Sequence, residues 1–229
     1  MTVPLTPETL PASAPGQPIA EHYSTLPGQL RAALGSIPVL IAFVMFVLII
    51  IVAVCAPLLG TVDPVAINPA ERLAKVSSAH WLGTDAFGRD TYSRALYGAR
   101  VSLIVGIGAT VMSLIAGLFI GVIAGYFRFA DGIIMRVMDG IMAIPGILLA
   151  IALVSLTGGS LVTVLVAITI PEIPRVVRLV RGVILSVRAE PYVEAAVSLG
   201  TRVRTILWRH MIPNTIAPLI VQGTYIFAA

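Results

Sequence analysis

Charged residues are scarce in this chain. Asp, Glu, Lys and Arg make up 11% of its 229 residues, whereas soluble domains contain about 25%. Apolar residues make up 58%, and the mean hydropathy is +0.98. A soluble fold needs a polar surface, and long stretches of this sequence offer none. The composition therefore excludes an ordinary soluble domain and indicates a protein of the lipid bilayer.

Cysteine and lysine are almost absent. Cys55 is the only cysteine, so this chain alone forms no disulfide framework and no cysteine-rich metal site. Lys75 is the only lysine and is not part of a G-x-x-x-x-G-K-[ST] loop that would bind ATP. No H-E-x-x-H motif occurs, and His22, His80 and His210 fall in three separate regions. We predict no catalytic residue, no metal ion and no cofactor in this chain, which disfavours a membrane-embedded enzyme.

Long apolar runs are what the chain does contain. A helix needs about 20 such residues to cross the hydrocarbon core, and several runs approach this length. The predicted fold class is all-α, a polytopic helical membrane protein. The expected segments are a Pro-rich tail at 1–36, spans at 37–59, 101–127, 133–156 and 161–180, an outer loop at 60–100, a cytoplasmic loop at 188–212 and the start of a fifth span at 214–229.

Arginines predict the orientation of these spans. They accumulate from Arg175 to Arg209, after the fourth span, and such basic stretches face the cytoplasm. Counting back, the loop at 60–100 lies outside and the N-terminal tail lies inside. The net charge of +4 is explained by this pattern without nucleic acid as a partner. The apolar run after Pro213 is too short for a full span at about 1.5 Å per residue, so we expect further residues after Ala229.

The cytoplasmic loop has the pattern of two short helices between spans. Pro191 suits the first turn of a helix and Gly200 suits its end, which predicts a helix over 191–199. A second helix is expected to begin near Thr201 and to lead toward Pro213. On these features alone, a solvated loop explains the segment equally well.

The same loop resembles the EAA loop of binding-protein-dependent ABC importer permeases. The matching residues are, in order and spacing, Glu194, Ala195, Ala196, Gly200, Ile206, His210 and Pro213. The resemblance implies that the loop docks into a cleft of a separate ATPase subunit, which binds ATP and Mg. Small alanines let a helix enter a groove closely, and glycine permits a sharp turn. Either Arg202, Arg204 and Arg209 contact that ATPase, or they only mark the inner face.

The outer loop carries a second resemblance, to the C-type permease subunit of dipeptide, oligopeptide and nickel importers. The matching residues are His80 to Asp85, Gly88 to Asp90, Ser93-Arg94 and Leu96 to Arg100. The similarity continues to Ala229 and implies an ABC importer type I-like permease fold. It also implies a homologous permease partner, two ATPase subunits and an extracytoplasmic solute-binding protein. Trp81 departs from the family pattern, which usually has a smaller residue there.

Four charged residues are candidate site residues of the outer loop: Asp85, Arg89, Asp90 and Arg94. Gly83 and Gly88 indicate a turn-rich loop, in which these side chains are merely solvated. They can instead form an ion-pair network that braces the outer vestibule or meets the binding protein. The sequence leaves both interpretations open.

Small residues recur at every fourth position of the second span, at Ala109, Ser113, Gly117, Gly121 and Gly125. Such a stripe lets another helix approach closely. Helix packing is the first interpretation, and a sliding surface during transport is the second.

Charges and prolines mark the third and fourth spans. Arg136 and Asp139 stand three residues apart, so they can pair on one helical face, as a structural ion pair first and a gate element second. Pro145, and Pro171 with Pro174, are expected to bend these spans, because each proline removes a helix hydrogen bond.

Together these observations predict the permease subunit of an ATP-driven importer. It would move di- or oligopeptides across the bacterial cytoplasmic membrane by alternating access, driven through the EAA-like loop. The same machine importing nickel chelates or opines is the alternative within this class. A passive helical channel is the alternative from another class, and it explains the spans but not the EAA-like loop.

Overall fold

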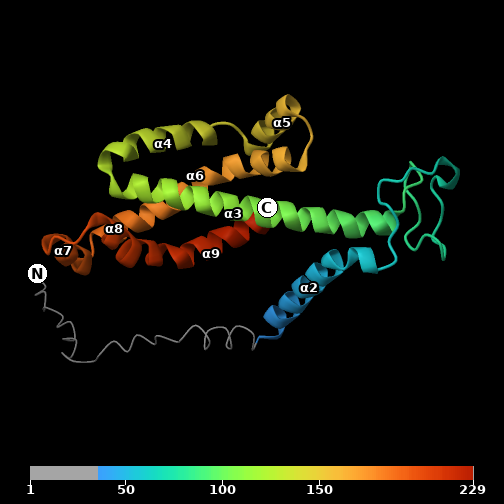
Figure 1. Cartoon of the computed structure of the whole chain (residues 1–229), viewed down its shortest axis with the longest axis horizontal. Helices are drawn as coiled ribbons and strands as arrows, with labels where there is room; N and C mark the ends of the chain where they lie inside the picture. The colour runs from blue at the N-terminus through green and yellow to red at the C-terminus, as the bar shows by residue number, and fades with distance from the viewer. Residues whose placement is uncertain (1–35, 229) are drawn as a thin grey trace, which may run out of the picture. The chain divides into compact units, whose positions relative to one another are not determined.

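The structure is a computed structural model that describes residues 36–228 (Figure 1). The Pro-rich tail predicted at 1–36, with His22, lies outside the described residues except for Ser36. The described part is helical, with one isolated bridge between Thr84 and Asp90 and no strand, as the all-α prediction requires. Its elements are α2 (Ile37–Val54), η1 (Ala56–Leu58), η2 (Pro69–Glu71), α3 (Thr91–Tyr126), α4 (Arg128–Met142), α5 (Gly146–Thr157), α6 (Leu161–Arg188), α7 (Pro191–Ser198), α8 (Val203–Ile206), η3 (Leu207–Met211) and α9 (Ile212–Ala228).

Two described helices are long and apolar enough to cross a membrane, α2 and α3, and the bent pair of α4 and α5 is a third if it counts as one span. α2 is described by itself: it has 18 residues, no charge, and apolar side chains that are mostly exposed. α6 is long enough but carries Glu172 and several arginines, and α9 has 17 residues. The spans expected at 161–180 and 214–229 therefore stay predictions.

α3 begins inside the segment predicted as outer loop. Asp90 is its N-cap, and its carboxylate accepts a hydrogen bond from the N–H of Ser93 at 2.7 Å. This cap satisfies a backbone donor and starts the helix at Thr91. With 36 residues, α3 is about 54 Å long, well over the thickness of about 30 Å of a hydrocarbon core. The sequence pattern did not predict this cap, because the charged residues up to Arg100 indicated a polar loop.

The stripe of small residues on α3 packs against α6. Ala109, Ser113, Gly117, Gly121 and Gly125 are all buried. A Cβ atom on Gly121 would lie 2.7 Å from Cβ of Val180, and one on Gly125 would lie 2.7 Å from Cβ of Ile184. Only glycine fits at such distances, so this structure shows the stripe in the packing role. A sliding role stays a prediction.

The residue pairs between helices give their relative directions. Gly117, Gly121 and Gly125 of α3 face Val176, Val180 and Ile184 of α6 in rising order, so these two helices run parallel. α9 runs antiparallel to α3, because Gly106 faces Phe227 whereas Gly223 faces Leu114. α3, α6 and α9 pack against one another, and α4 packs against α3 and α6 (Figure 1). Parallel α3 and α6 are what two spans in the same direction require.

The third predicted span is two helices instead of one. α4 and α5 meet at an angle of 83° across Ala143 to Pro145. Pro145 has no N–H and disfavours a helical residue before it, and Gly146 follows it directly. The bend expected at Pro145 is thus a full interruption, whereas α6 continues as one helix through Pro171 and Pro174.

Candidate functional site

The predicted cytoplasmic loop contains a separate helix, α7. It begins with Pro191 at its first helical position, where a missing N–H costs nothing. Its bounds match the helix predicted over 191–199 except that it is one residue shorter. After the turn at Gly200, α8 begins at Val203, two residues later than expected for the second helix.

The end of α7 is a Schellman motif. The N–H of Thr201 donates to the carbonyl of Ala196 at 3.1 Å, and the N–H of Gly200 donates to the carbonyl of Val197 at 2.9 Å. This motif needs a left-handed residue after the helix, and Gly200 has a φ of +72°. A glycine at this position therefore has a backbone reason, apart from any contact with a partner.

One face of α7 anchors it to the bundle. Val193 is 1% exposed and packs in the main apolar core with Ile206 and Met211. The ring of Tyr192 lies 5.8 Å from the ring of His210. Since Met211 and His210 belong to η3, these contacts join α7 to the helical segment that continues into α9.

The other face of α7 is exposed. Glu194 and Ala195 are exposed, Val197 is 55% exposed and Leu199 is 86% exposed. These exposed side chains leave this part of α7 free to contact a partner protein. Four of the predicted coupling residues thus lie on α7 or at its end, namely Glu194, Ala195, Ala196 and Gly200.

The remaining predicted coupling residues lie on the following helix. His210 is half-buried in the π-helical turn η3, and Pro213 lies in the first turn of α9. The side-chain amide of Asn214 donates to the carbonyl of His210 at 2.5 Å. α8, η3 and α9 follow one another without a loop, so the helical segment that contains the predicted start of the fifth span begins before residue 214. Arg202, Arg204 and Arg209 are exposed, which fits both of their interpretations.

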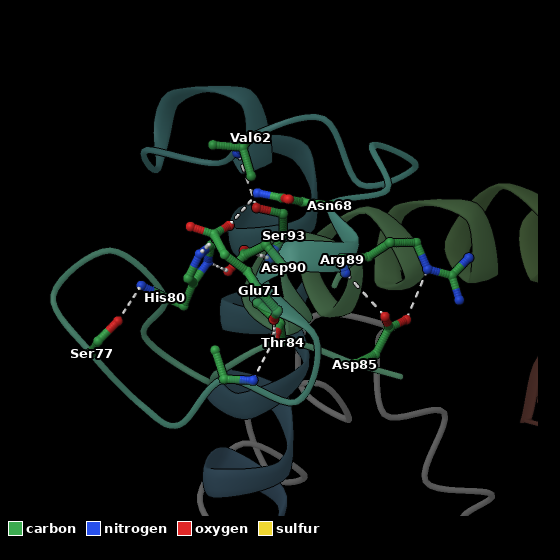
Figure 2. A network of polar contacts seen from close by, with 11 residues as sticks. Val62, Asn68, Glu71, Ser77, His80, Thr84, Asp85, Arg89, Asp90 and Ser93 are labelled. Carbon is green, nitrogen blue, oxygen red and sulfur yellow. Dashed lines mark hydrogen bonds and ion pairs between the residues drawn. The ribbon is translucent and has the colours of Figure 1, made fainter. Parts of the chain in front are cut away.

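The outer loop at the other end of α3 is held by hydrogen bonds (Figure 2). The Ser93 hydroxyl accepts from the N–H of Val62 at 2.9 Å. The Thr84 hydroxyl accepts from the N–H of Ala74 at 2.8 Å and donates to the carbonyl of Glu71. These bonds join segments ten or more residues apart and close the loop over the start of α3.

The four predicted outer-loop residues form two groups. The Asp85 carboxylate accepts from Nε of Arg89 at 2.8 Å and from Nη1 of Arg94 at 2.9 Å. Asp90 instead caps α3 and faces His80, whose Nδ1 lies 3.0 Å from its carboxylate. Asp85, Arg89 and Arg94 therefore form ion pairs as predicted, while Asp90 belongs to a second cluster around His80. A bracing or binding-protein role for these charges stays a prediction. The sequence alone did not indicate this role for His80.

The ionisation of the outer loop follows from these contacts. The hydrogen bond with Asp90 raises the pKa of His80, although partial burial opposes this, and Glu71 adds to it from 3.3 Å. Burial would raise the pKa of Asp85, but hydrogen bonds from the N–H groups of Arg89 and Phe87 outweigh it and lower this pKa to about 2. Both ring nitrogens of His80 face carboxylates, so both donate when the ring is protonated.

The pair predicted between Arg136 and Asp139 is replaced by a different one. Asp139 accepts from Nη2 of Arg178 on α6 at 2.5 Å, while Arg136 lies on α4 without a part in this pair. Asp131 accepts a second contact from α6, with Nη2 of Arg181 at 2.7 Å. Arginines of α6 thus tie it to α4. The three-residue spacing favoured a partner on the same helix, because such spacing contains no information about neighbouring helices.

Sequence comparison decides the family. A model of the family described as "Binding-protein-dependent transport system inner membrane component" matches residues 113–229. This chain belongs to that family. The match covers most of the stripe of α3, the charged face of α6 and the whole loop that contains α7. It confirms the resemblance to binding-protein-dependent importers.

Several members of the family are similar to this chain over most of its length. A probable peptide ABC transporter permease protein of Sinorhizobium fredii is 53% identical over 78% of this chain and 61% of its own length. A dipeptide transport system permease protein of Alkalihalophilus pseudofirmus is 46% identical over 76% of this chain and 58% of its own. A di/tripeptide transport system permease protein of Pseudomonas aeruginosa is 34% identical over 96% of this chain and 74% of its own. The chain thus spans about 60% of the length of the first two of these relatives.

Proposed function

We propose that this chain acts as a permease subunit of an ATP-driven importer of small peptides in the bacterial cytoplasmic membrane. It has no catalytic role of its own. A homologous permease completes the pathway, two ATPase subunits bind ATP and Mg on the inner side, and a solute-binding protein delivers the solute from outside. The N-terminal tail lies in the cytoplasm. Family membership and the peptide-transport names of the relatives support this proposal.

The observation that carries the coupling role is the construction of α7. One face is fixed in the core by Val193, and the other presents Glu194, Ala195 and Leu199 to the solvent. A helix held in this way can transmit the movement of a partner subunit to the bundle. ATP binding would close the ATPase pair, move α7 with it and switch the two permeases between inward-open and outward-open states.

The test compares charge reversal at the two ends of the bundle. Glu194→Arg combined with Gly200→Pro should lower both uptake and solute-stimulated ATP hydrolysis in proteoliposomes by about tenfold or more, because it alters the contact face and breaks the Schellman turn. The control is Asp63→Arg, an equal reversal at an exposed position of the outer loop. Unchanged uptake and complex assembly in the double variant would contradict the coupling role.

The solute is tested separately. The cognate binding protein, purified without added solute, should contain short peptides by mass spectrometry. If the binding protein contains a nickel chelate or an opine instead, the importer function stands and the peptide assignment is wrong. Uptake that persists without ATP would instead indicate a passive channel.

A further inference from the structure

An open cavity lies at the interruption between α4 and α5, where both meet α6. Its volume is about 590 Å³, which falls in the range of about 300–1,000 Å³ of small-molecule sites. Most of its lining is apolar, including Ile147 of α5 and Ile168 of α6. Glu172 and Arg175 are the charged residues of its lining.

The position of the two charges along α6 is unusual. Glu172 lies about 17 Å from the start of α6 at Leu161 and about 24 Å from its end at Arg188, near the middle of the span predicted at 161–180. The Arg175 side chain is nevertheless 57% exposed in this chain, and that of Glu172 is 15% exposed. An arginine at this depth faces water or protein and avoids lipid, because a charge in hydrocarbon is costly. The cavity side of α6 is therefore a pathway side or a permease contact.

The hydrogen bonds of Arg175 distinguish it from the next arginines of α6. Arg178 and Arg181 are tied to Asp139 and Asp131 of α4. Arg175 pairs within its own helix, and both of its bonds to Glu172, at 2.8 and 3.0 Å, come from Nη1. This pair lies within one helix, so opening it breaks no tie between helices. This pair can exchange partners without loosening the bundle.

We propose that Glu172 and Arg175 form a solute-recognition site for zwitterions at the membrane centre. The Glu172 carboxylate accepts hydrogen bonds from the terminal ammonium group of a short peptide, and the Arg175 guanidinium donates to its terminal carboxylate. Two opposite charges of the protein then meet two opposite charges of the solute, so the net charge at this depth stays at zero. The apolar lining contacts the side chains of the peptide with little selectivity. This proposal rests on the proposed importer function and adds the place and chemistry of recognition.

The first test asks whether the cavity holds water. Cys55→Ser removes the single cysteine, and Ile147→Cys or Ile168→Cys then places a thiol in the cavity. In the assembled transporter in proteoliposomes, a charged methanethiosulfonate reagent should label both thiols, and glycyl-leucine supplied with its binding protein should slow labelling about tenfold. Val176→Cys is the control, because Val176 is 0% exposed against α3 and a thiol there should not react. Cavity thiols that react no faster than the thiol of this control would overturn the proposal.

The second test separates recognition from structure. Wild type should transport glycyl-leucine at least about tenfold better than its N-acetyl or C-amide derivatives, since a charged hydrogen bond is lost in each. Glu172→Gln should abolish the preference over the N-acetyl form, and Arg175→Gln the preference over the amide. Asp139→Asn removes a tie between α4 and α6 and should lower all rates without changing their ratios. Ratios that stay constant in the Glu172 and Arg175 variants would overturn the recognition site.

The two failures remain distinguishable. The wild-type transporter could hydrolyse ATP in response to its binding protein and yet transport neither glycyl-leucine nor its two derivatives. In that case the peptide assignment and the zwitterion site both fail. The labelling result then still decides whether the cavity lies on the pathway. If dipeptides are transported but the ratios of transport rates are the same in the wild type and in the Glu172 and Arg175 variants, only the recognition site fails.

Discussion

The two ends of α3 are built in different ways. At the outer end, side chains bond to backbone groups far away in the sequence, as Ser93 does with Val62 and Thr84 with Ala74. At the inner end, α7 is fixed to the bundle chiefly by the buried Val193 and by the ring contact between Tyr192 and His210. The outer loop is thus cross-linked by hydrogen bonds, whereas α7 rests on a few apolar contacts, among which Val193 is its buried residue.

This difference shows how one subunit can be stiff on one side and responsive on the other. Many bonds that close long loops make local opening costly, while a short helix with few buried contacts opens or shifts more easily. The same kind of residue serves both designs: Gly88 and Gly200 both have a positive φ, +74° and +72°. Their surroundings differ, however, and this gives matched substitutions.

The largest effect is expected from Gly88→Ala. A Cβ atom there would overlap the carbonyl oxygen of Asn68, and the backbone conformation is itself unfavourable for alanine. We expect the outer loop to lose its native packing, at a cost of about 3 kcal/mol or more. Hydrogen exchange in residues 62–94 should rise strongly while α7 stays as in the wild type. Protection that is unchanged in the loop would show that its backbone can move aside at little cost.

The next effect is expected from Val193→Ala at the inner end. Removing two buried methyl groups from the anchor of α7 should cost about 2 kcal/mol, and hydrogen exchange of residues 191–198 should increase. Val197→Ala is the matched control at an exposed position of the same helix, with an expected change within about 0.5 kcal/mol. Equal effects of the two substitutions would show that α7 is not held by Val193.

A smaller effect is expected from Gly200→Ala. Nothing lies within 4 Å of the position of its Cβ, so only the left-handed backbone opposes the substitution. The cost should be about 1 kcal/mol, measured as faster exchange of the N–H groups of Gly200 and Thr201. Gly182→Ala, which also meets open space but in a regular helix, should be neutral or slightly stabilising. A cost at position 200 as large as at position 88 would remove the contrast between the two ends.

The smallest effect is a pH dependence confined to the outer loop. The pKa of His80 is raised above 6.5 in the folded loop. Its contribution to stability is therefore present below pH 6.5 and is lost as the pH rises through the raised pKa. Exchange in residues 71–90 should be slower at about pH 6 than at about pH 9, after correction for the intrinsic rate. His80→Gln should remove this difference, and a difference that survives in it would assign the effect to another group.

At acidic pH the stability of the same loop changes in the opposite direction, because it falls as the pH falls. The pKa of Asp85 is lowered to about 2 and that of Asp90 is also lowered, so their contributions are present above pH 3.8 and are lost as the pH falls through these lowered values. The outer loop is therefore most stable at pH values above 3.8 and below the raised pKa of His80.

The sequence predicted local features of the fold better than contacts between helices. Pro191 and Gly200 mark α7 to within one residue because helix ends depend on backbone chemistry of adjacent residues. The stripe from Ala109 to Gly125 likewise indicated a close helix contact, since glycine spacing shows in the sequence. The sequence did not predict that α6 is the helix that packs on this stripe, because no sequence pattern links Gly121 to Val180.

Side-chain partners were predicted least well. Asp139 was assigned to Arg136 by spacing, but its partner Arg178 comes from another helix. Asp90 was grouped with arginines, yet it caps α3 and faces His80. Both choices depend on tertiary positions that spacing along one helix does not encode. Whether the inner loop contacts an ATPase is likewise a property of a second protein, so the resemblance to a family indicated it and the residues alone did not.

The helical segment from Val203 through η3 to Ala228 has one mechanical consequence. It contains no loop and is about 40 Å long, so a push on its first turn cannot be absorbed by a flexible joint. The segment can therefore transmit a rotation along its whole length. One end lies beside α7 and the other carries Phe227 against Gly106, deep in the bundle. A torque applied beside α7 would therefore turn side chains at the far end of the segment, and the wide π-helical turn η3 is the place where the segment can twist.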